Sequence, residues 1–137
     1  MSVIPRRHLL ALPCALAAGL RAAARTVRGR FTKGGTLITP EGRRIKLDGD
    51  ESARKVYDDE RLEGVDFEVE GEFKGDVFVA EPIHKRPLWA WRNGERRMVT
   101  YWCWVCFIRT YAPGPCWCCQ AEFELDFKDP SAKDPTP

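Results

Sequence analysis

The chain has 137 residues, the usual length of one domain, and its 44% hydrophobic and 31% charged residues are typical of a soluble globular protein. The net charge is +2, but four of the 22 basic residues and no acidic residue lie in residues 1–25, which leaves 18 basic against 20 acidic residues in the rest. This balance excludes the strongly basic character of most nucleic-acid-binding domains, and we expect no nucleic-acid partner.

An export signal is predicted at residues 1–25. Arg6 and Arg7 form a short basic region, an apolar run covers residues 9–20, and small residues follow at 22–24, which is the order of parts in an export signal. The segment "RRHLL" resembles the twin-arginine (Tat) motif, in which two arginines are followed after one residue by apolar residues. The resemblance implies a periplasmic or secreted protein. The apolar run, about a dozen residues, is too short for a transmembrane segment, and we expect none in the mature chain.

From Val27 the chain is predicted to form β-structure, with three short β-type runs that are separated by Gly34-Gly35 and by Pro40-Glu41-Gly42. Short β-type runs at residues 36–39 and 43–47 flank the turn Pro40-Glu41-Gly42, which predicts a hairpin because glycine and proline favour turn conformations. Asp50 is predicted to cap a helix from Glu51 to Arg61, since its carboxylate can accept hydrogen bonds from the free amides of the first turn.

Two further strands are predicted after the helix, at residues 65–73 and 77–80. In the first, apolar residues alternate with acids, and a period of two places these acids on the opposite face, where we expect them to contact solvent: Asp66, Glu68, Glu70 and Glu72. The order of three strands, a helix and two strands resembles the OB-fold, a five-stranded barrel with a helix between its third and fourth strands. The resemblance implies an OB-like β-barrel over residues 26–86 but names no ligand, because this fold serves many functions.

Residues 87–128 are predicted to form a β-hairpin and cysteine-cluster module. Asn93-Gly94 lies between two β-rich runs, which is a strong signal for a tight hairpin. The segment "AEFELDF" alternates apolar and acidic residues and predicts another strand. The tail at residues 129–137 is rich in proline and polar residues, and we expect it to be disordered.

Five of the six cysteines lie between Thr100 and Gln120. They form two C-x-x-C motifs, and such pairs present thiolates to a tetrahedral metal ion. The motifs resemble the knuckles of zinc-ribbon and rubredoxin-type sites, which implies a bound metal. The candidate ligands are Cys103, Cys106, Cys116 and Cys119, with Cys118 as an alternative ligand. Zinc is the simplest choice of metal, and soft thiolates also suit iron or an iron–sulfur centre.

Other interpretations of the cluster stay open. Disulfides are expected if the thiols meet an oxidising compartment, and a thiol–disulfide or iron redox role is a further alternative. Trp104 and Trp117, with the other aromatic residues of this stretch, are expected to form a hydrophobic lid over the site. His84 is a weak candidate for a general base, and no complete catalytic constellation is visible.

The function expected from the sequence is therefore that of a small exported metal-binding protein, acting as a binding or assembly module rather than an enzyme. Its partner, a protein or a small molecule, and its oligomeric state are not specified by these residues.

Overall fold

The computed structural model describes residues 25–137, and the predicted export signal lies outside them apart from Arg25. Within this range the chain is mainly β-structure. No helix among these residues has the length and hydropathy needed to cross a membrane. In chain order the elements are β1 (Arg25–Thr32), β2 (Thr36–Ile38), β3 (Arg44–Asp48), α1 (Glu51–Tyr57), the 3-10 helix η1 (Glu60–Leu62), β4 (Asp66–Lys74), β5 (Val77–Ala80), the 3-10 helix η2 (Ile83–Lys85), β6 (Leu88–Arg92), β7 (Glu95–Cys103), β8 (Ile108–Thr110) and β9 (Glu124–Lys128).

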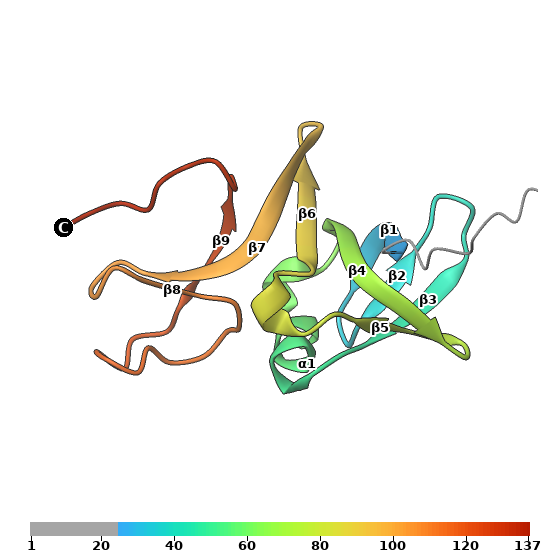
Figure 1. Ribbon diagram of the computed structural model, residues 1–137, viewed down its shortest axis with the longest axis horizontal. Helices are drawn as coiled ribbons and strands as arrows, with labels where there is room; N and C mark the ends of the chain where they lie inside the picture. The colour runs from blue at the N-terminus through green and yellow to red at the C-terminus, as the bar shows by residue number, and fades with distance from the viewer. Residues whose placement is uncertain (1–24) are drawn as a thin grey trace, which may run out of the picture.

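The first five strands close into a barrel (Figure 1). Neighbours pair in the order β1-β2-β3-β5-β4, and β4 pairs again with β1. The contact between β3 and β5 is parallel, whereas the other barrel pairs are antiparallel. With α1 between β3 and β4, this is the OB-like barrel that the sequence predicted.

The helix is shorter than predicted. The Asp50 side chain caps it by accepting a 2.9 Å hydrogen bond from the Ala53 amide, as expected. However, α1 ends at Tyr57 rather than at Arg61. The reason is Asp59, whose carboxylate accepts a 3.0 Å hydrogen bond from the Arg61 amide and starts the separate turn η1. Side chains of this kind compete with helical backbone hydrogen bonds and so favour helix ends.

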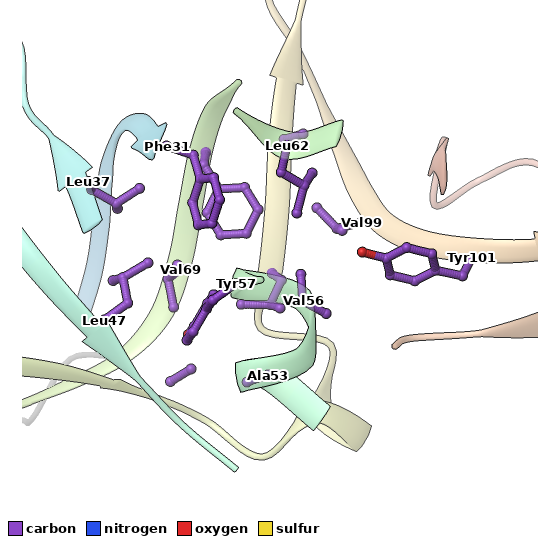
Figure 2. Close-up of a cluster of buried hydrophobic side chains, with 14 of the residues drawn as sticks. Phe31, Leu37, Leu47, Ala53, Val56, Tyr57, Leu62, Val69, Val99 and Tyr101 are labelled. Carbon is purple, nitrogen blue, oxygen red and sulfur yellow. The ribbon is translucent and has the colours of Figure 1, made fainter. Parts of the chain in front are cut away.

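Aromatic and aliphatic side chains fill the barrel (Figure 2). The rings of Phe31 and Phe67 lie 4.9 Å apart at their centroids, and both side chains are fully buried. The apolar face of α1, formed by Ala53, Val56 and Tyr57, packs into the same cluster. Burying each large side chain contributes about 1.5–3 kcal/mol, so this face holds the helix against the barrel.

The core continues beyond the barrel into the C-terminal module. Buried Val99, Tyr101 and Cys103 of β7 belong to the same hydrophobic cluster, as do Cys116 and Phe123. Figure 2 shows Tyr101 on β7 with its hydroxyl group turned toward the core residues. The cysteine segment is therefore packed against the rest of the molecule through a common core.

The strand β7 links the two regions of the sheet. Its first half pairs with β6, and the turn between them, Asn93-Gly94, has φ angles of 52° and 74°, which are the positive values of a tight hairpin. Its second half pairs with β8 and with β9. Figure 1 shows β7 running from the barrel side to the end of the molecule where β8 and β9 lie.

Two acids of β4 are less exposed to solvent than expected. Glu68 is buried and Glu70 is half-buried, and both accept 2.6 Å hydrogen bonds from the guanidinium group of Arg96. The guanidinium carbon of Arg96 also lies 3.7 Å from the centroid of the Trp89 ring. The prediction was wrong for Glu68 and only partly met at Glu70, because β6 pairs with β4 and β7 pairs with β6, which brings Arg96 over this face.

Candidate metal centre

Four cysteine sulfurs converge at the end of β7. Cys103 is the last residue of that strand, and Cys106 lies in the turn between β7 and β8. Cys116 and Cys119 belong to the segment between β8 and β9, which is joined at its base by a bridge between Pro115 and Glu122. The four sulfur atoms all lie within 4.8 Å of one another.

The two C-x-x-C motifs form turns with the same backbone pattern. The amide of Phe107 donates a 2.8 Å hydrogen bond to the Cys103 carbonyl, and the amide of Gln120 donates a 2.8 Å hydrogen bond to the Cys116 carbonyl. Phe107 and Gln120 follow the second cysteine of each motif, and both have positive φ angles, 53° and 67°. Non-glycine residues adopt this conformation uncommonly, so its occurrence at both positions identifies a repeated structural unit, here called a knuckle.

Backbone amides in each knuckle also point at sulfur. The amide of Cys106 lies 3.4 Å from the sulfur of Cys103, and the amide of Cys118 lies 3.4 Å from the sulfur of Cys116. Donors of this kind favour the charged thiolate. Hydrogen bonds from the backbone amides of Cys119 and Cys118, opposed by burial, lower the pKa of the Cys116 thiol to about 7.

The spacing of the sulfurs fits a tetrahedral metal ion. Zinc–sulfur bonds of about 2.3 Å place the ligand atoms of a regular tetrahedron about 3.8 Å apart. The sulfurs of Cys103 and Cys119 lie 3.5 Å apart, and the full group lies within 4.8 Å. All four ligand atoms come from the protein, so a bound ion would have a closed, four-coordinate shell.

The described residues contain no disulfide. Cysteines 103, 106, 116, 118 and 119 are free thiols, and the 3.5 Å between the sulfurs of Cys103 and Cys119 is far longer than the S–S bond of about 2.05 Å. The disulfide alternative raised by the sequence is therefore not the arrangement in this structure.

Cys118 lies outside the group of four. Its side chain is exposed, whereas Cys103 and Cys116 are buried and Cys106 and Cys119 are half-buried. The neighbouring thiols, Cys118 first among them, together with burial raise the pKa of the Cys106 thiol above its ordinary range. A bound cation reverses such a shift, because coordinated thiols lose their protons.

The aromatic residues around the site form only part of the expected lid. Trp102 is buried, with an edge-to-face contact to Phe107 at 5.8 Å between centroids. Trp104 and Trp117 are 57% and 65% exposed. Each of them follows the first cysteine of its knuckle, so the two tryptophans occupy equivalent positions in the two motifs.

A polar contact that sequence reasoning missed holds the module to the barrel side. Asp59 is 5% exposed at its side chain and accepts hydrogen bonds from Arg61 and from the Tyr101 hydroxyl, the latter at 2.8 Å. Nε and Nη2 of Arg61 donate to Asp59, and its third nitrogen, Nη1, donates to the Phe123 carbonyl at 3.1 Å. Burial opposes ionisation of Asp59, but the bonds from Arg61 and Tyr101 outweigh it and lower the pKa of the carboxyl.

His84, the candidate general base, lies in η2, outside the cysteine segment, and is exposed. Among the described residues, the group able to hold a metal consists of cysteines only.

Compared with known proteins, the chain matches no family model, no curated sequence and no solved structure. The assignment of the site therefore depends on its geometry.

Proposed function

We propose that this is a small metal-binding β-protein in which Cys103, Cys106, Cys116 and Cys119 hold one structural zinc ion. The observation that carries the proposal is the convergence of four sulfur atoms, from two knuckles of the same backbone form, to within 4.8 Å of one another. Four protein ligands leave no open position for a substrate, which is the usual difference between a structural and a catalytic zinc site.

The ion stabilises a segment that has little regular structure of its own. Between β8 and β9 the chain forms turns and a single bridge. A tetrathiolate ion links this segment to the end of β7 and so contributes folding free energy directly. The amides that point at the sulfurs of Cys103 and Cys116 supply hydrogen bonds to the thiolates when the ion is bound.

The test is metal analysis of protein purified natively with its thiols protected. One zinc ion per chain and no visible absorbance are expected. Cys106→Ala is expected to abolish stoichiometric binding and lower the melting temperature. Gln120→Ala, which keeps all five thiols of the cluster, serves as the matched control and should retain the ion. A chain without metal whose Cys106→Ala variant melts at the same temperature contradicts the proposal.

Iron is the second candidate, and the amide–sulfur contacts favour it as much as zinc because they stabilise any tetrathiolate. An iron centre absorbs visible light and changes oxidation state, which would make the protein an electron carrier. Visible absorbance that bleaches on reduction would replace the structural role with this redox role.

We further propose that the protein acts outside the cytoplasm, as a binding or assembly module. The basic-apolar-small order of residues 1–25 supports export, and cell fractionation with mass analysis of the mature N-terminus tests it. A binding role is supported by the closed metal shell and by the exposed indoles of Trp104 and Trp117, because tryptophan is enriched where proteins meet partners.

A further inference from the structure

The large hydrophobic side chains that are exposed in residues 25–137 all lie in the two knuckles. They are Trp104, Val105 and Trp117, and Val105 is the most exposed of them at 70%. The first two lie in the turn between β7 and β8, and Trp117 lies in the segment between β8 and β9. Figure 1 shows both stretches at the end of the molecule away from the barrel strands. Exposed hydrophobic side chains that gather in one place mark a contact surface.

The metal centre brings the two stretches together. Trp104 directly follows Cys103 and Trp117 directly follows Cys116, and the sulfurs of these two cysteines belong to the group that lies within 4.8 Å. The exposed residues of the two knuckles therefore form one tip of the molecule. This knuckle tip consists of Trp104, Val105 and Trp117.

Each indole ring of the knuckle tip is packed against another aromatic ring. The ring of Trp104 contacts that of Phe107 edge-to-face at 6.1 Å between centroids, and the ring of Trp117 lies 5.4 Å from that of Phe123. Both tryptophans are nevertheless more than half exposed. Apolar rings that are held in place while exposed lose less side-chain freedom on contact, which lowers the entropy cost of binding.

The size and charge of the knuckle tip indicate what it contacts. A protein interface of ordinary size buries about 800 Å² on each partner, and three side chains of at most about 250 Å² each are too few for a stable dimer. Residues 103–107 and 111–121 contain no acidic or basic residue. Tryptophan on an uncharged turn is well suited to the boundary between lipid and water, where this residue is enriched in membrane proteins.

We propose that Trp104, Val105 and Trp117 insert into the interfacial layer of a lipid bilayer, so that the knuckle tip is a membrane-contact site. The inference rests on the proposed binding role and names its partner as a lipid surface. Four thiolates outweigh the charge of one Zn²⁺ ion, so the loaded centre is negatively charged and repels anionic lipids. The contact is therefore apolar, and neutral lipids are its preferred surface.

The test uses the full chain loaded with zinc and phosphatidylcholine vesicles that carry bromine on their acyl chains close to the headgroups. Bromine quenches tryptophan fluorescence only at short range, and residues 1–25 contain no tryptophan, so quenching reports on the knuckle tip rather than on that segment. The wild type is expected to be quenched equally at low and at high salt, because salt screens contacts between charges but not apolar ones.

Two variants have matched controls. Val105→Glu is expected to weaken binding about tenfold, because it replaces an apolar side chain with a charged one, whereas Val105→Leu should bind as the wild type does. Trp117→Ala is also expected to lose about tenfold. Gln120→Ala, which alters an exposed residue of the same knuckle, should retain binding. Melting temperature and zinc content are measured for each variant, so that a folding defect is recognised.

Several results would overturn the membrane contact. Zinc-loaded wild type without quenching does so and leaves the metal centre standing, as does equal quenching of Val105→Glu and Val105→Leu. Quenching only by anionic phosphatidylglycerol vesicles and only at low salt shows a charge contact instead. A wild-type dimer that Val105→Glu dissociates gives the tip to a second copy of the chain. Wild type that is quenched but holds no zinc supports the membrane contact and refutes the metal centre alone.

Discussion

The hydroxyl group of Tyr101 donates a 2.8 Å hydrogen bond to the carboxylate of Asp59, across 42 positions of sequence. Tyr101 is fully buried on β7, and Asp59 begins the turn η1 after the helix. The bond joins the strand that carries the first cysteine ligand to the helical connection of the barrel. Several properties of the protein depend on this contact.

Tyr101→Phe is expected to destabilise the protein by about 1.5–3 kcal/mol, because it removes a hydrogen bond to a charged group and leaves that group buried. Tyr57→Phe is the matched control, since the Tyr57 hydroxyl donates to a neutral acceptor, the Asp48 carbonyl, at 3.0 Å. Its expected cost is about 1 kcal/mol. Urea unfolding measures both, and equal losses in the two variants would contradict the role given to the Asp59 charge.

The stability of the protein is expected to depend on pH through Asp59. Its pKa is lower in the folded protein than in the unfolded chain, so its contribution is fully present above the unfolded pKa, near 4, and is lost as the pH falls through the folded pKa. The difference in unfolding free energy between wild type and Asp59→Asn should stay constant from about pH 7 to pH 5 and shrink below about pH 4. A difference that is the same at every pH argues against this assignment.

Arg96→Ala is expected to cost about 2 kcal/mol, because it leaves two partly buried carboxylates without their partner. Arg96 is 32% exposed at its side chain, and its partners Glu68 and Glu70 are 11% and 30% exposed. Arg97→Ala is the control, since its partner Glu95 is 64% exposed, and its cost should stay within about 0.5 kcal/mol. Adding Glu68→Gln to Arg96→Ala should recover part of the loss, and a double-mutant cycle measures the coupling.

Gln120→Gly is expected to stabilise the zinc-loaded protein by about 0.5–1 kcal/mol, because glycine adopts positive φ without the steric cost of a side chain. Gln120 has a φ of 67° and is exposed, so its side chain contributes little packing that would be lost. Gln120→Val should have the opposite sign, since a branched side chain is disfavoured in this conformation. Thermal unfolding of the two variants is the measurement, and a loss of stability in both would show that the knuckle backbone is not the source of the strain.

Local patterns in the sequence predicted most of the strands and the group of cysteines. The turn at Asn93-Gly94 and the strand at residues 77–80 depend on neighbouring residues alone, and both are confirmed. The spacing of the two C-x-x-C motifs is equally local, and the structure brings these four cysteines together. The same spacing set Cys118 apart as an alternative ligand, but its exposed position outside the group of four is a property of the folded chain.

The contacts that were missed join residues far apart in sequence. A period of two shows which residues share a face of β4, but it does not show that β6 and β7 bring Arg96 over Glu68. The predicted end of α1, Arg61, lies beyond the observed end, Tyr57, for a related reason. Asp59 begins a new turn and also accepts a bond from Tyr101, and neither of these effects is visible in the apolar periodicity of the helix.

The last barrel strand ends at Ala80, before the first cysteine ligand in the chain. The barrel strands are therefore available for folding before the cysteine ligands during synthesis of the chain. All five barrel strands have left the ribosome before Cys103, and Cys119 follows Ala80 by 39 residues. At ordinary rates of translation this interval lasts about 2–8 s, whereas small domains fold within seconds or less. The barrel can therefore close before the last cysteine ligand is available. The metal ion then binds next to a barrel that has already folded.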